Sequence, residues 1–130
     1  MNEDDPLLKG QETLQRVEDL ISKVDEIVDR WPRYHKNKYA LDMYRHLTHM
    51  EELCVAANLR YFKKSTLQDL DISNKQLQLL IRRVGREKFT DKKGKERMLV
   101  TDGFREDLDR RTAEIGRLIG GWLKATKEKN

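Results

Sequence analysis

The chain has 130 residues, of which 38% are charged and 37% hydrophobic, and this length suits one domain (1–130) with a single core. Two prolines and seven glycines exclude a turn-rich all-β fold, no apolar run approaches the ~20 residues of a membrane span, and the acidic start MNEDDP does not resemble a signal peptide. A single cysteine excludes an internal disulfide, so we expect a cytoplasmic protein with no membrane partner.

The first helix is predicted over residues 6–30. Asp5 suits the N-cap position and Pro6 the first helical position. Apolar residues then follow in alternating steps of three and four: Leu14, Val17, Ile21, Val24, Val28 and Trp31. This spacing is typical of a helix in a bundle or coiled coil, and Pro32 is expected to end the helix.

The second helix is predicted over residues 34–62 and repeats this spacing. Its apolar stripe comprises Ala40, Met43, Leu47, Met50, Cys54, Ala57 and Tyr61. Because Cys54 lies on that stripe, we interpret it as a small core residue rather than a reactive thiol. Ser65 and Gln68 form a capping-box pattern that is expected to begin the next helix.

The third helix is predicted over residues 66–88. Its stripe comprises Leu67, Leu70, Asn74, Leu77, Ile81 and Val84, and a single polar residue such as Asn74 in a seam often fixes the register. The following segment, KFTDKKGKERMLVTDG, contains Gly94 and a short apolar piece. It is either a small hairpin or a mobile loop, and the pattern does not decide between them.

The fourth helix is predicted over residues 102–126, with Thr101 or Asp102 as N-cap and acidic residues in its first turn. Its apolar positions are Phe104, Leu108, Ile115, Leu118, Ile119 and Trp122. Four helices joined by short links predict an all-α, up-down-up-down four-helix bundle.

Glycines interrupt this last helix at Gly116, Gly120 and Gly121. Each glycine inside a helix costs about 1 kcal/mol relative to alanine, so some contact must compensate. Gly116 and Gly120 share one helix face, which would let another helix approach closely, and Trp122 offers a large side chain for an interface. We therefore expect a self-association surface; the alternative is that these glycines only relieve crowding within one subunit.

Charge is unevenly distributed along the chain. Residues 1–29 carry nine acidic and three basic side chains, whereas residues 30–130 carry 24 basic and 14 acidic ones. In an up-down bundle, the link between the first two helices and the link between the last two lie at the same end. We expect nucleic-acid or partner contacts from the cations there: Arg30, Arg33, Lys36, Lys38, Arg82, Arg83, Arg86, Lys88, Lys92, Lys93, Lys95 and Arg97.

Two alternatives to this interpretation stay open: a solvated surface, and a surface for an acidic protein partner. Tyr34 and Tyr39 lie among these cations and would either stack on unpaired bases or pack against the end of the bundle.

The sequence contains few residue patterns that are typical of an enzyme. His46 and His49, with Glu51 and Glu52 beside them, are the best metal candidates. A di-iron bundle needs Glu-x-x-His on two helices, and here the order is wrong and no second copy exists. We expect no cofactor, no metal and no enzymatic activity.

Three segments resemble a known family: RWPR near Trp31, VAAN at the end of the second helix, and EIGRLIGGWLKA near the C-terminus. They are similar to the accessory variability determinant (Avd) proteins of diversity-generating retroelements, relatives of the four-helix proteins encoded in 23S rRNA intervening sequences. The resemblance implies a non-catalytic homo-oligomer, a pentameric barrel, that binds nucleic acid and the reverse transcriptase and supports mutagenic cDNA synthesis from template RNA. It supports Arg33 and Arg117 as contact residues.

The runner-up interpretations are an intervening-sequence-type protein and a basic scaffold that binds only protein.

Overall fold

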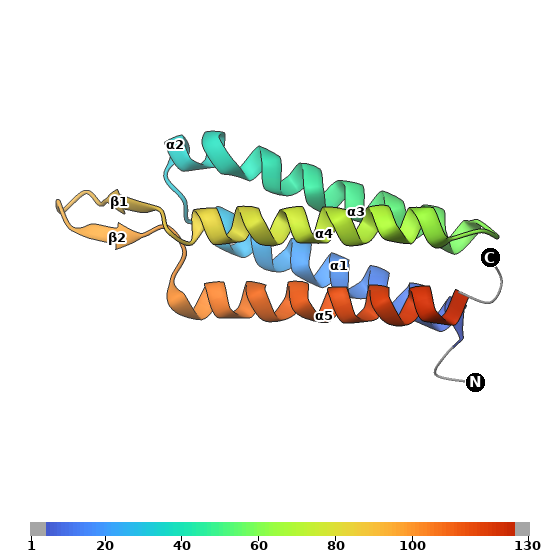
Figure 1. Ribbon diagram of the computed structural model, residues 1–130. Helices are drawn as coiled ribbons and strands as arrows, with labels where there is room; N and C mark the ends of the chain where they lie inside the picture. Colours follow the sequence, from blue (N-terminus) through green and yellow to red (C-terminus); the bar gives the residue numbers. More distant parts are fainter. Residues whose placement is uncertain (1–4, 127–130) are drawn as a thin grey trace.

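The computed structural model describes residues 5–126 and forms an antiparallel bundle with a hairpin at one end (Figure 1). The elements are α1 (Pro6–Val28), α2 (Arg33–His35), η1 (Lys36–Ala40), α3 (Leu41–Leu59), α4 (Lys64–Val84), β1 (Lys88–Thr90), β2 (Glu96–Met98) and α5 (Asp102–Thr126). Because α2, η1 and α3 follow one another without a break, the described chain contains four long helical rods.

Each rod packs against its neighbours in the chain. α1 contacts α3 and α5, and α4 contacts the same two helices, so the rods surround one core in an up-down-up-down order. The predicted all-α bundle is confirmed. None of the helices within residues 5–126 combines the length and apolar character needed to cross a membrane.

α1 begins as predicted, because the Asp5 carboxylate accepts a hydrogen bond from the Leu7 backbone N–H at 2.9 Å. It ends at Val28, two residues earlier than expected. Leu20 and Ile27, which the predicted stripe omitted, are also buried. The buried face is wider than one seam because α1 packs against two helices.

The second rod contains a π-helical turn, η1, at its start. His35, Tyr39 and Met43 are four residues apart and all buried. Four residues exceed one α-helical turn, so the wider π turn keeps these side chains in line before α3 resumes the predicted stripe. The assignment of Tyr61 to that stripe was wrong, since α3 ends at Leu59 and Tyr61 is exposed.

The predicted capping box is also wrong. α4 begins at Lys64, so Ser65 lies inside its first turn, and Lys63 occupies the N-cap position without a side-chain cap. The Lys63 ammonium donates to the Ala57 carbonyl at 2.6 Å. This contact with the end of α3 favours a short, tight link.

α4 carries the predicted stripe, and all six residues are buried. The Asn74 side-chain amide donates to the Thr112 carbonyl of α5 at 2.9 Å. Such a bond ties the two helices together at one height. α4 ends at Val84 rather than at 88, because a turn at Arg86 and Glu87 leads into the hairpin.

Of the two alternatives predicted for the connection before α5, a hairpin or a mobile loop, the structure shows the hairpin. β1 and β2 pair antiparallel, with Phe89 opposite Arg97. The Asp91 carboxylate accepts from the backbone N–H groups of Lys93 and Lys95, both at 2.9 Å, and Gly94 takes φ +78°. That left-handed position favours glycine and closes the turn.

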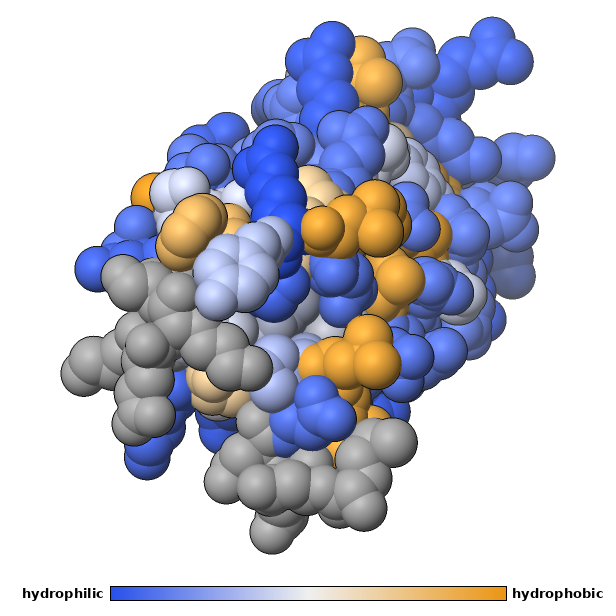
Figure 2. Space-filling model, turned by 90° about the vertical axis from the view of Figure 1, so that its right-hand side faces the viewer, coloured by the Kyte–Doolittle hydropathy of each residue, from blue (hydrophilic) through white to orange (hydrophobic). Residues whose placement is uncertain are grey.

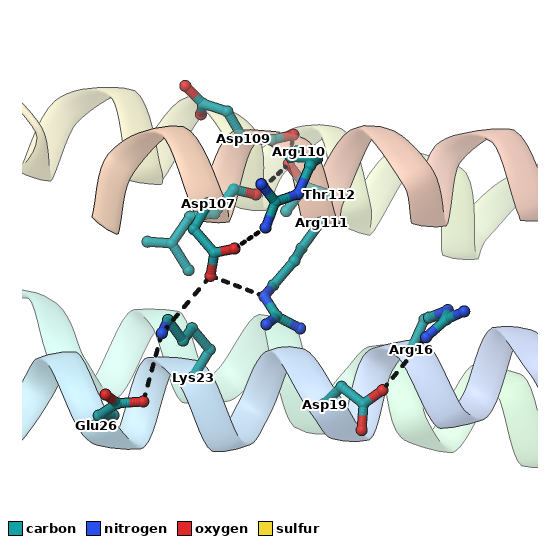
Figure 3. Close-up of polar contacts among 10 residues, drawn as sticks. Arg16, Asp19, Lys23, Glu26, Asp107, Asp109, Arg110, Arg111 and Thr112 are labelled. Atoms are coloured by element: carbon teal, nitrogen blue, oxygen red, sulfur yellow. Dashed lines mark hydrogen bonds and ion pairs between the residues drawn. The ribbon is translucent and has the colours of Figure 1, made fainter. Parts of the chain in front are cut away.

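α5 occupies the predicted range, and the Thr101 hydroxyl accepts from the Phe104 N–H at 3.4 Å, as an N-cap does. Polar contacts join α5 to α1 (Figure 3). Arg16 lies 3.0 Å from Glu114, and Lys23 lies 3.8 Å from Asp107.

The glycines of α5 are not crowded within one subunit. A Cβ on Gly116 would lie 3.6 Å from Asn74, an ordinary contact, and a Cβ on Gly120 would meet no described atom within 4 Å. Crowding within the subunit therefore does not explain them. Trp122 is fully buried in the core, as its place on the apolar stripe predicted, so its side chain is not available as an interface anchor.

Candidate nucleic-acid interface

The two basic segments lie together at one end of the bundle, as the topology predicted. We call this end the basic pole and define it by residues 30–39 and 82–97. The Trp31 indole N–H donates to the Leu99 carbonyl at 3.1 Å, and the rings of His35 and Phe89 lie 6.1 Å apart. These contacts fix the start of the second rod against the base of the hairpin (Figure 1).

Glu87 joins the two segments electrostatically. It accepts a hydrogen bond from the Tyr39 hydroxyl, and the Lys38 ammonium lies 3.6 Å from it. The hydrogen bond from Tyr39, together with the Lys38 charge, lowers the pKa of Glu87. Burial and the bond to Glu87 raise the pKa of the Tyr39 hydroxyl, so it stays protonated and donating.

The two tyrosines of the pole have different positions. Tyr39 is buried and packs against the end of the bundle, whereas Tyr34 is 66% exposed. Of the two predicted alternatives, packing therefore holds for Tyr39, and only Tyr34 is free to stack on a base.

Three of the predicted cations are paired with carboxylates. Besides Lys38, Lys88 lies 3.3 Å from Glu96, and Arg97 donates to Asp91 at 2.6 Å. The bond from Arg97 lowers the pKa of Asp91. These cations hold the hairpin and its base in shape.

The other predicted cations have no carboxylate within ion-pair distance among residues 5–126. The Arg30 guanidinium lies 5.2 Å from the centre of the Phe104 ring, a cation–π contact. The rest of this set is exposed except for the half-buried Lys36: Arg33, Lys36, Arg82, Arg83, Arg86, Lys92, Lys93 and Lys95. Lys92, Lys93 and Lys95 lie around the hairpin turn, the part of the hairpin furthest from the bundle (Figure 1).

A groove of about 590 Å³ opens between the hairpin and the ends of α1 and α5. Ile27, Phe89 and Phe104 contribute apolar side chains, and the charged lining consists of three cations and two carboxylates: Arg30, Lys95, Arg97, Glu96 and Asp102. Aromatic rings beside cations suit a ligand that combines a flat ring with an anionic group.

The sequence analysis missed the contribution of α5 to this end. Phe104 lines the groove, and Arg105 faces the end of α4. The signal was present, since the first turn of the last helix must lie at the same end as the hairpin that precedes it.

The candidate assembly residues lie elsewhere on α5. Gly116, Arg117, Gly120 and Trp122 belong to its second half, away from the basic pole (Figure 1). Arg117 is exposed and makes no ion pair with a residue between 5 and 126. It is therefore free to meet a partner, although no contact of that kind is present in the single chain.

The opposite end of the bundle, around residues 59–64, is the distal pole. Leu59, Tyr61 and Phe62 are 83%, 72% and 67% exposed. Figure 2 looks onto this end and shows hydrophobic side chains, in orange, between hydrophilic ones. Exposed apolar side chains grouped in this way are typical of a protein contact surface.

Metal and thiol chemistry find no support in the described residues. Within 5–126, no three His, Cys, Asp or Glu side chains are grouped so that they could hold a metal ion. Cys54 is buried, as predicted, and desolvation raises the pKa of its thiol to about 12.

Comparison with known proteins places the chain in a family. The family model described as bAvd-like matches residues 13–126, from the second turn of α1 to the end of α5. This match confirms the resemblance to Avd proteins. No curated protein matches the chain significantly.

Proposed function

Because the chain belongs to the bAvd-like family, an accessory and non-catalytic kind of protein, we propose that it serves a diversity-generating retroelement by binding nucleic acid and the reverse transcriptase. In this role it holds template RNA or cDNA near the polymerase and supports mutagenic cDNA synthesis. The protein itself contributes binding surfaces and no reacting group.

One observation carries the nucleic-acid part of the proposal: two distant basic segments meet at the basic pole and leave most of their cations unpaired. Charges that neutralise no carboxylate of their own chain are available to phosphates. Binding of this kind releases counterions, carries no base specificity and weakens steeply with salt.

The groove and Tyr34 favour single-stranded over duplex nucleic acid. Unpaired bases stack on aromatic side chains, a contact worth about 1–3 kcal/mol per base, whereas paired bases keep their faces stacked on one another. The aromatic side chains of the groove lie next to cations that would hold the adjoining phosphates.

The protein partners would use surfaces away from the basic pole. The apolar side chains of the distal pole and the uncrowded glycines of α5 support contacts with the polymerase and with further copies of this chain. The pentameric barrel is proposed from the family alone. The same distal surface favours the second candidate function, a scaffold that binds only protein.

The decisive variant combines Lys92→Glu, Lys93→Glu and Lys95→Glu. We expect wild-type protein to retain a labelled 12-nucleotide RNA at low salt, and the triple variant to lose this binding. If the three lysines contact phosphates, the slope of log affinity against log salt falls by about 2, since each phosphate contact contributes about 0.7 for single strands. Fluorescence anisotropy over a salt series measures both quantities.

A matched control variant makes the same change in net charge outside the basic pole. It combines Lys64→Glu, Lys75→Glu and Lys124→Glu, three lysines whose side chains are exposed. It should keep the wild-type affinity within about threefold if the pole, rather than net charge, binds RNA. Equal losses in both triple variants would contradict the assignment. If the wild-type protein binds neither RNA nor duplex DNA, the nucleic-acid function is excluded and the scaffold that binds only protein becomes the favoured function.

A further inference from the structure

A polar notch of about 450 Å³ separates the end of α4 from the start of α5. Every residue that lines it has a polar side chain: Gln78, Arg82, Arg86, Arg105, Asp109 and Thr112. Unlike the groove beside the hairpin, this notch therefore has nothing that would recognise an apolar ligand.

Two facing rows of side chains form the notch. Gln78 and Arg82 are four residues apart on one face of α4, and Arg86 follows in the turn just after this helix ends. Arg105 approaches them from α5. The like charges of these arginines repel one another, so this arrangement is not favourable in itself.

The charge of these guanidinium groups is poorly neutralised. Asp109 is the carboxylate of the lining, and its oxygen lies 4.0 Å from the Arg105 Nε, with both side chains about half exposed. Arg82 and Arg86 make no ion pair with any residue between 5 and 126. The lining therefore carries three positive charges against one negative charge.

A helix dipole explains the position of Arg82 but not that of Arg105. Arg82 lies in the last turn of α4, where the dipole stabilises a cation. Arg105 lies at the start of α5, where the dipole opposes a cation and attracts an anion. A bound anion would offset this unfavourable placement of Arg105.

Gly85 makes room for Arg105. A Cβ at this position would lie 2.7 Å from the Arg105 Cδ and 3.2 Å from the Ile81 carbonyl oxygen. The backbone of Gly85, at φ −66° and ψ −13°, suits any residue, so its conformation does not require glycine. What glycine provides here is the close approach of the Arg105 side chain to α4.

We propose that the notch is a phosphate-binding site. Three guanidinium groups offer donors from several directions, which fits a tetrahedral phosphate with its several oxygens, whereas a carboxylate is satisfied by one bidentate arginine. The ligand is a backbone phosphodiester of RNA or DNA, or a terminal phosphate. The assignment to a nucleic-acid backbone phosphate rests on the proposed function, whereas the inference that the notch binds phosphate does not.

The test uses three single variants of the full chain. Gly85→Ala keeps every charge but displaces Arg105, and Arg105→Gln removes one charge from the notch. Arg45→Gln is the control, since it removes the same charge from an exposed site on α3. Thermal melting followed by circular dichroism verifies that all three remain folded.

Two probes separate the possible sources of phosphate: inorganic pyrophosphate, and a 12-nucleotide RNA without terminal phosphates. Calorimetry measures the first and fluorescence anisotropy the second. We expect Gly85→Ala and Arg105→Gln to weaken at least one probe about tenfold, and Arg45→Gln to weaken neither by more than about twofold. Loss confined to pyrophosphate assigns terminal phosphates, and loss of RNA assigns the backbone.

The outcomes distinguish this inference from the proposed function. If wild-type protein binds RNA and neither notch variant weakens either probe beyond the control, the phosphate site is overturned and the proposed function stands. If wild-type protein binds pyrophosphate but no RNA, and Gly85→Ala weakens pyrophosphate, the site stands and the proposed function fails.

Discussion

Gly10 is the glycine that the packing of this bundle requires. A Cβ there would lie 1.9 Å from the Asn58 Oδ1 and 2.8 Å from the Trp122 Cζ2. The indole of Trp122 is fully buried, so it has little freedom to withdraw. At the scale of single residues, α1 therefore approaches the end of α3 and the Trp122 ring more closely than any side chain would allow.

Gly10→Ala should destabilise the protein by about 1–3 kcal/mol, the usual range for overpacking a core. Gly120→Ala, on an exposed position of a helix with open space around it, should instead stabilise an isolated subunit by about 1 kcal/mol. Urea unfolding followed by circular dichroism measures both. If Gly10→Ala leaves the stability unchanged or raises it, the packing described for Gly10 is contradicted.

At the scale of elements, the contact between α1 and α5 depends on a carboxylate that is only 15% exposed, Asp107 (Figure 3). It accepts hydrogen bonds from Arg110 and from the Arg111 Nε, the latter at 2.9 Å, and Lys23 of α1 lies 3.8 Å away. The bond from Arg111 is the main cause of its lowered pKa. The deprotonated carboxylate is therefore more favourable in the folded than in the unfolded chain.

This difference predicts how stability depends on pH. Because the pKa of Asp107 is lower in the folded state, its contribution is fully present above the ordinary aspartate pKa of about 3.9 and is lost as pH falls through the lowered value. Asp107→Asn should cost about 2 kcal/mol at pH 7. The gap between variant and wild type should close as the pH falls below 3.9.

Urea unfolding at several pH values provides the measurement, with Asp42→Asn as control. Asp42 forms a 3.5 Å pair with Arg45 at an exposed site, so its loss should change stability by less than about 0.5 kcal/mol. A pH-independent gap for Asp107→Asn would show that the lost contact is steric rather than ionic.

At the scale of the whole molecule, Gly120 indicates a surface that one subunit does not use. It lies inside α5 at a cost of about 1 kcal/mol, and no described atom lies within 4 Å of the position its Cβ would occupy. Nothing in the described subunit compensates for this cost. Close approach by a second copy would, since a helix face without side chains permits backbone contact.

Gly120→Leu should therefore disrupt the proposed self-association while leaving each bundle folded. Sedimentation velocity should show a shift from the oligomer to the mass of one 15.5 kDa chain. Gly103→Leu is the control, because Gly103 is also in α5 with open space around it but lies at the basic pole. An unchanged sedimentation mass for Gly120→Leu would exclude this position from the subunit interface.

The sequence alone determined the helices, their order and the end at which the charges meet. Stripes spaced by three and four residues bury one face of a helix wherever it packs, and short links force neighbouring helices to run antiparallel. These rules are local, so they predicted Asp5 as a cap, Cys54 and Asn74 in the core, and the juxtaposition of the two basic segments.

The tertiary structure decided everything that depends on the distance between helices. Tyr34 and Tyr39 are the same residue type and lie in the same basic segment. Only Tyr39 points inward, because the π turn of η1 directs its side chain toward Glu87. Trp122 lies on a predicted apolar stripe, but only the structure shows that its ring packs inside the core rather than at an interface. The side chain of Arg105 approaches the end of α4 closely because Gly85 has no Cβ. Such placements arise from contacts between residues far apart in the chain, and no local pattern encodes them.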